Sequence, residues 1–253
     1  FYGLSWNQYT VPLLPSDQNG MNGAGLLGRD DGVTFWGTSG KFQYAAGLFD
    51  GVDSVAGSPN QDDSLLFATR LAYNFLNMES NPGYYTSSTY YGSLGEIFTL
   101  GFSYQSQSDA TGTAAEPADF SAYILDFLWE DPLDSGGVVT VEGELKSFDA
   151  EMTPAASLSC GAYCLFDGSS YFVTAAYLFP NGDGKIRPQP YIRYNSNEPD
   201  GGTDSDLTEL GLNLIMNGHN TRFNFSYTSG DANLSGFPGA DVDTFSFGVQ
   251  VQI

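Results

Sequence analysis

The chain has 253 residues and a formal net charge of -22, with 30 acidic and 8 basic side chains. This charge argues against nucleic acid as a partner, because little in the chain could neutralise phosphates along a groove. No apolar run reaches the roughly 20 residues of a transmembrane helix, which excludes a helical membrane protein.

Residues of alternating polarity recur along the chain, and a period of two predicts β-strands. In the last segment, "TFSFGVQVQI" (244–253), Phe, Val and Ile alternate with Thr, Ser, Gly and Gln. Earlier, "LGLNLIMNGHNTRFNFSYTSG" (210–230) has two such runs around Asn-Gly, a strong hairpin signal. The chain predicts twelve strands in order, at about 2–11, 30–38, 40–50, 64–77, 95–106, 119–131, 137–149, 169–180, 185–196, 206–218, 220–230 and 242–253.

The intervals between these strands alternate in length. Short turns follow the second, sixth, eighth and tenth strands, with the sequences "TSGK", "DPLDSG", "PNGDGK" and "NGHN". The other intervals are longer and more polar, at 12–29, 51–63, 107–118, 150–168, 197–205 and 231–241, while 77–95 is long where a short turn is expected. Tight periplasmic turns and long external loops are typical of outer-membrane barrels. We therefore predict an all-β fold, a transmembrane antiparallel up-and-down β-barrel that forms one domain over 1–253.

The alternation also separates the charged side chains from the apolar ones. The apolar set is rich in Phe and Tyr, and Tyr and Trp cluster near strand ends, as in the aromatic girdles of membrane barrels. The charged side chains of the strands fall on the opposite face, and we predict that they line a channel: Lys41, Arg70, Asp126, Glu142, Glu144, Lys146, Arg187, Arg193, Glu209 and Arg222. Alternation alone also occurs in soluble sandwiches and lipocalins. The features that favour the membrane barrel are the alternation of short turns with long loops and the aromatic residues near strand ends.

Two local features modify this pattern. Pro188 and Pro190 cannot donate ladder hydrogen bonds, so we expect a distorted periplasmic start to the strand at 185–196. The chain begins at "FYGLSWNQYTV", already within a strand-like pattern, so we expect a signal segment to precede Phe1.

Several hairpins resemble the phosphate-selective porin O and P family of Gram-negative outer membranes. The similar segments are "SSYFVTAAYLFPNGDGKIRPQPYIRYNSN", "LTELGLNLIMNGHNTRFNFSY", "RDDGVTFWGTSGKFQYAAGLFDG" and "LLFATRLAYNF", the last with Arg70 at the family's Ala-Arg-Leu position. The resemblance implies a sixteen-stranded, trimeric barrel in the cell outer membrane. The four further strands would precede Phe1, although a twelve-stranded barrel is the alternative. Ile253 departs from the terminal aromatic residue that is usual in such barrels.

The expected function is that of a porin, a water-filled channel for passive diffusion of small polar or ionic solutes. The resembled family uses arginines and lysines for phosphate selectivity, but this chain has only 8 basic residues, at least six of them on the predicted lumen face. Most carboxylates lie in loops such as "EPDGGTDSD" at 198–206. We therefore expect an acidic mouth and weak or cation-leaning selectivity, unlike a phosphate channel.

The sequence also contains a cysteine pair, Asp-rich turns and one histidine, which are candidates for other sites. Cys160 and Cys164 favour a loop disulfide in an oxidising compartment, with free thiols as the alternative. Asp-rich turns could bind Ca²⁺ weakly, but Asp, Asn and Gly also simply form turns, so no cofactor is expected. His219, the one histidine, lies in a hairpin turn, so we expect no enzyme. The alternative functions are an anchor or sheath for a partner protein and a secreted β-sandwich that binds glycans.

Overall fold

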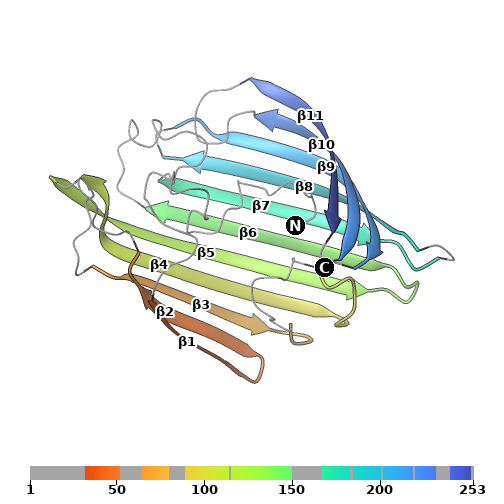
Figure 1. Cartoon of the computed structure of the whole chain (residues 1–253), viewed down its shortest axis with the longest axis horizontal. Helices are drawn as coiled ribbons and strands as arrows, with labels where there is room; N and C mark the ends of the chain where they lie inside the picture. Colours follow the sequence, from red (N-terminus) through yellow and green to blue (C-terminus); the bar gives the residue numbers. More distant parts are fainter. Residues whose placement is uncertain are drawn as a thin grey trace.

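The protein is described by a computed structural model at residues 32–51, 64–79, 89–113, 115–149, 167–182, 185–200, 202–218, 220–231 and 240–251. These residues form one antiparallel sheet in which each strand pairs with its neighbours in sequence, in the order β1 to β11 (Figure 1). The strands are β1 (Gly32–Ser39), β2 (Phe42–Phe49), β3 (Leu66–Asn74), β4 (Ile97–Thr113), β5 (Glu116–Pro132), β6 (Val138–Asp149), β7 (Gly168–Leu178), β8 (Arg187–Pro199), β9 (Ser205–Asn217), β10 (Thr221–Asp231) and β11 (Asp241–Val251).

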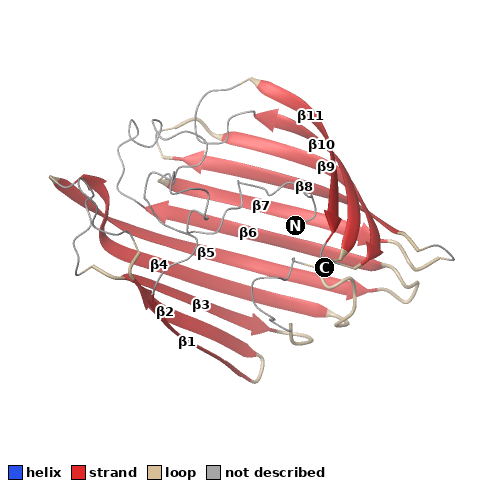
Figure 2. Cartoon of the chain, in the orientation of Figure 1, coloured by secondary structure: helices blue, strands red, loops and turns tan. Residues whose placement is uncertain are grey.

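The all-β, up-and-down architecture predicted from the alternation is confirmed (Figure 2). The eleven strands correspond to the second to twelfth predicted strands, within a few residues at every end except that of β4, which extends from the predicted 106 to Thr113. The strand predicted at 2–11 lies outside the described residues, so the count of twelve is not confirmed. The described part of the chain contains no helix long and apolar enough to cross a membrane.

The described sheet has two edges, β1 and β11, and no pairing between them is found among the described residues. The sheet curves strongly, so that β9 to β11 turn away from the plane of the central strands (Figure 1). Closure into a barrel therefore remains a prediction.

The interval 107–118 is not the long loop that the sequence predicted. The β4–β5 ladder continues to the pair Thr113 and Glu116, and its register shifts between Gln107 and Thr111. Asp109, inside the shift, has a φ of 55°, and such a bulge admits extra residues without ending the ladder. The segment "QSDATGTAAEPA" contains no large apolar residue, so it lacks the apolar alternation by which the other strands were found.

The start of β8 is irregular, as its two prolines predict. β8 pairs with β7 only from Tyr191 to Pro199, although its pairing with β9 begins already at Arg187. The backbone nitrogens of Pro188 and Pro190 carry no hydrogen, which accounts for the missing pairs on one side.

The two faces of the sheet differ sharply in exposure. We call the face that carries the buried side chains the covered face and the opposite one the exposed face. Among the described residues, the buried side chains comprise 21 polar or charged and 14 apolar residues, whereas 30 large apolar side chains are exposed. In β10, for example, Arg222, Asn224 and Ser226 are buried, while Phe225 between them is 46% exposed. The buried side chains of this sheet are therefore mainly polar, whereas the buried core of a water-soluble protein is mainly apolar.

Candidate functional site

Eight of the ten charged residues predicted to line a channel project from the covered face of β3 to β10. They are Arg70, Asp126, Glu142, Glu144, Lys146, Arg193, Glu209 and Arg222. The other two bind backbone carbonyl groups at the end of the sheet that carries the short turns. Lys41 donates from Nζ to the carbonyl of Phe75 (2.7 Å), and Arg187 donates from Nε to that of Phe179 (2.9 Å).

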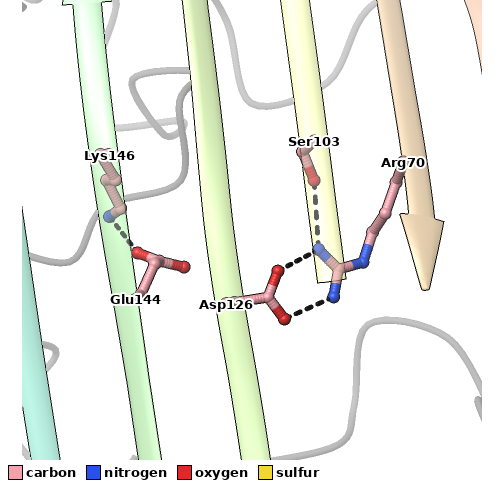
Figure 3. Close-up of polar contacts among 5 residues, drawn as sticks. All are labelled: Arg70, Ser103, Asp126, Glu144 and Lys146. Atoms are coloured by element: carbon pink, nitrogen blue, oxygen red, sulfur yellow. Dashed lines mark hydrogen bonds and ion pairs between the residues drawn. The ribbon is translucent and has the colours of Figure 1, made fainter. Parts of the chain in front are cut away.

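An ion pair crosses β4 between Arg70 on β3 and Asp126 on β5 (Figure 3). The guanidinium donates from Nη1 and Nη2 to the two carboxylate oxygens, at 2.6 and 2.7 Å, and Nη1 also donates to Ser103 Oγ at 3.1 Å. Gly101 lies beneath the pair, and a Cβ there would lie only 2.6 Å from Arg70 Nη2. The absence of a side chain on β4 therefore leaves the space that the pair occupies.

A second pair continues the same line of charges on β6. Glu144 is the register partner of Asp126, and the Nζ of Lys146 lies 2.8 Å from Glu144 Oε1. Residues i and i+2 of a strand share a face, so this pair forms along a single strand. Lys146 is only 2% exposed, so its positive charge requires the nearby carboxylate (Figure 3).

A third pair lies further along the covered face, on β6 and β8. Arg193 Nη2 lies 3.6 Å from Glu142 Oε1, and Arg193 Nε donates to Thr174 Oγ1 at 2.9 Å. The guanidinium also lies over the ring of Phe172, 5.5 Å from its centre. Arg193 is thus fixed on three sides, which favours a single position for its charge.

Uncharged side chains extend this polar surface over β8, β9 and β10. The Tyr191 hydroxyl donates to Glu209 Oε1 and accepts a hydrogen bond from Asn224 Nδ2 (3.1 Å). Asn224 also donates to Asn213 Oδ1 (3.0 Å), and Asn213 donates to Gln189 Oε1 (3.1 Å). Five buried polar groups on three strands are therefore joined in one network.

The sequence analysis missed one acidic residue, Glu130, which is fully buried. Its carboxylate accepts hydrogen bonds from Thr89 Oγ1 (2.7 Å), from the Tyr90 and Gly92 backbone N–H groups (3.1 and 2.6 Å), and from Thr140 Oγ1 (3.2 Å). Glu130 is separated from Asp126 by an even number of residues in β5, and this period of two would have assigned it to the charged face. Three of its four donors, however, come from a segment about 40 residues away in sequence.

Counted with Glu130, the eight residues give this face four basic and five acidic side chains, a balance of one negative charge. The carboxylates of Asp126, Glu142 and Glu144 take part in the ion pairs found among the described residues. The carboxylates of Glu130 and Glu209 instead accept hydrogen bonds from uncharged groups, such as the Gly92 N–H group and the Tyr191 hydroxyl. The face therefore carries an almost balanced, mixed field despite the strongly acidic composition of the chain.

Arg222 on β10 lies between two different groups. Its Nε donates to Gln250 Oε1 of β11 at 2.7 Å. The guanidinium also lies beside the phenol of Tyr91, which comes from the segment between β3 and β4. Burial raises the pKa of this phenol, and the positive charge of Arg222 acts in the opposite direction.

The other predicted sites receive no structural description. Cys160, Cys164 and His219 lie outside the described residues. In the part of the chain that is described, no group of three or more His, Cys, Asp or Glu side chains could hold a metal ion.

Comparisons with protein-family models, with curated proteins and with solved structures found no match to this chain. The resemblance to the phosphate-selective porins therefore remains a prediction from the quoted hairpins.

Proposed function

We propose that the chain is an outer-membrane porin, which closes into a transmembrane β-barrel and lets small polar or ionic solutes diffuse through a water-filled passage. In this proposal the covered face lines the passage and the exposed face contacts lipid. A Gram-negative outer membrane and a homotrimer follow only from the family resemblance.

The observation that carries the proposal is the inverted polarity of the sheet. Outward residues such as Leu125, Ile192 and Leu210 are 48 to 51% exposed, whereas Lys146 and Arg193 on the other face are 2 to 3% exposed. A soluble protein would leave such a broad apolar surface in water at a large cost, but hydrocarbon would solvate it. Strands that alternate apolar and polar residues are the form in which barrels cross membranes.

The balance of charge on the covered face indicates the ion preference. Four basic and five acidic groups produce a weak net field, and every basic group there has an acceptor or carboxylate partner. We expect weak or cation-leaning selectivity, because no excess of positive charge is available to concentrate anions.

Recording from purified protein in planar lipid bilayers tests both points. The expected result is stepwise conductance, with a reversal potential in a salt gradient that is close to zero or shifted toward cations. The absence of steps under any gradient would contradict the porin proposal. Strong anion preference would contradict the interpretation of the wall charges.

The alternatives make different predictions in the same preparation. A barrel that anchors or sheathes a partner protein would insert into the bilayer without conducting. A secreted glycan-binding sandwich would remain monodisperse without detergent, and it would need a second packed sheet, whereas the described residues form one.

A further inference from the structure

A short segment between β3 and β4, residues 89–96, extends from the start of β4 over the covered face. Tyr91 packs against a buried apolar cluster of Val138, Leu178 and Ile215, which belong to β6, β7 and β9. Its phenol lies beside Arg222 on β10. Because the strands are ordered by sequence, β10 lies six strands beyond β4. The segment therefore reaches across the hollow side of the curved sheet.

The Glu130 carboxylate holds the segment in this position. It accepts hydrogen bonds from the Thr89 hydroxyl and from the backbone N–H groups of Tyr90 and Gly92, at 2.6 to 3.1 Å. Thr89 and Glu130 are both buried, so replacing these bonds with water would require the segment to move.

The backbone of the segment is itself tightly turned. The Ser93 N–H group donates to the carbonyl of Tyr90 (3.0 Å), and that of Gly95 donates to the carbonyl of Gly92 (3.1 Å). Tyr91 and Gly92 have φ values of 54° and 77°, and the first is unfavourable for a residue with a bulky side chain. A Cβ on Gly92 would lie 2.8 Å from Val138, so the turn lies directly against β6.

We propose that residues 89–96 form the constriction of the passage, that Tyr91 limits which solutes pass, and that Glu130 is the positioning residue that holds the constriction in place. This inference rests on the proposed porin function. The constriction lies at the short-turn end, where Tyr91 packs between the apolar cluster and the guanidinium of Arg222.

The test compares single-channel conductance of the wild type, Tyr91→Ala and a matched control in planar bilayers. The control is Tyr177→Ala, since Tyr177 alternates with the buried Ala176 and Leu178 and so points to the opposite face near the same end. We expect Tyr91→Ala to raise the conductance about twofold, because the narrowest part of a pore dominates its resistance. It should also admit larger polyethylene glycols than the wild type, whereas Tyr177→Ala should match the wild type in both measurements.

Variants of Glu130 test how the segment is held. Glu130→Ala should raise the conductance as Tyr91→Ala does, and the double variant should add nothing further, because both changes remove the same obstruction. Glu130→Gln retains one acceptor oxygen and should give an intermediate conductance.

The outcomes separate the two proposals. A wild-type protein that never conducts would contradict the porin function itself. If the wild type conducts and Tyr91→Ala has an unchanged conductance and size limit, the constriction is overturned while the porin function stands. Additive effects of Glu130→Ala and Tyr91→Ala would overturn the positioning role of Glu130.

Discussion

Two glycines on the covered face, Gly101 and Gly211, make room for side chains from neighbouring strands. Gly101 lies beneath the ends of Arg70 and Asp126. Gly211 lies beneath the ring of Tyr191, which covers the position that a Cβ would take. Neither glycine has the positive φ that would by itself require glycine. Glycine is needed at both positions because a side chain from a neighbouring strand lies directly over the backbone there.

The two glycines should differ in their tolerance of alanine. Gly211→Ala would drive a methyl group into a rigid, buried ring, and we expect it to lower the free energy of unfolding by about 1–3 kcal/mol. Gly101→Ala would meet only the ends of two flexible side chains, and we expect a change below about 1 kcal/mol. Urea unfolding in lipid vesicles, followed by tryptophan fluorescence, measures both. Equal costs at the two positions would contradict this account.

At the scale of the strands, the network on β8, β9 and β10 fixes the position of Tyr191. Its hydroxyl donates to Glu209 and accepts from Asn224, so it links three strands through one oxygen. All three side chains are buried, and a lost partner would not be replaced easily by water. The hydroxyl therefore stabilises the relative positions of these strands, and it also holds the carboxylate of Glu209 in place.

Tyr191→Phe removes this hydroxyl and retains the ring. We expect the free energy of unfolding to fall by about 1.5–3 kcal/mol, the usual range for a hydrogen bond to a charged group. Tyr123→Phe is the matched control, because Tyr123 lies on the exposed face of β5 and is 41% exposed. The same vesicle unfolding assay applies. A control variant that loses as much stability as Tyr191→Phe would refute the role of the network.

The strands were predictable because a period of two survives in nearly every one of them. The face of each charged residue was predictable for the same reason, as Arg193 and Glu209 illustrate. Which charges would pair was not, because the contact of Arg193 with Glu142 depends on the registers of two ladders. The bulge at Asp109 escaped prediction because no large apolar residue flanks it to mark which face is which. The inward position of Tyr91 depends on contacts between residues remote in sequence, which periodicity does not encode.

For the molecule as a whole, polarity is arranged opposite to that of a soluble domain. The formal charge of the chain is -22, yet the charged groups of the covered face balance to within one unit. Most of the acidic excess must therefore belong to other parts of the chain, such as the acidic sequence at 198–206, where β8 ends and β9 begins. In the proposed membrane setting, the loops would carry the negative charge and the wall would be nearly neutral.

A charge placed on the exposed face distinguishes lipid from water as its surroundings. Leu125→Arg, near the middle of β5, should lower the free energy of unfolding in lipid vesicles by about 2–4 kcal/mol, because arginine is costly at the bilayer midplane. Leu133→Arg, in the turn after β5, should cost about 0–1 kcal/mol, because the membrane interface solvates it. Both leucines are exposed, at 48% and 37%. Similar small effects at both positions would indicate an aqueous surface.

The strictly consecutive strand order has a consequence for how such a chain can change in evolution. Each ladder joins strands that are adjacent in sequence, so a duplicated or deleted hairpin would leave the registers of all the others intact. A gain or loss of two strands would alter the circumference of a ring built this way without rewiring it. Related chains could then diverge in bore diameter in steps of one hairpin, while keeping the inward and outward identity of every residue that they share.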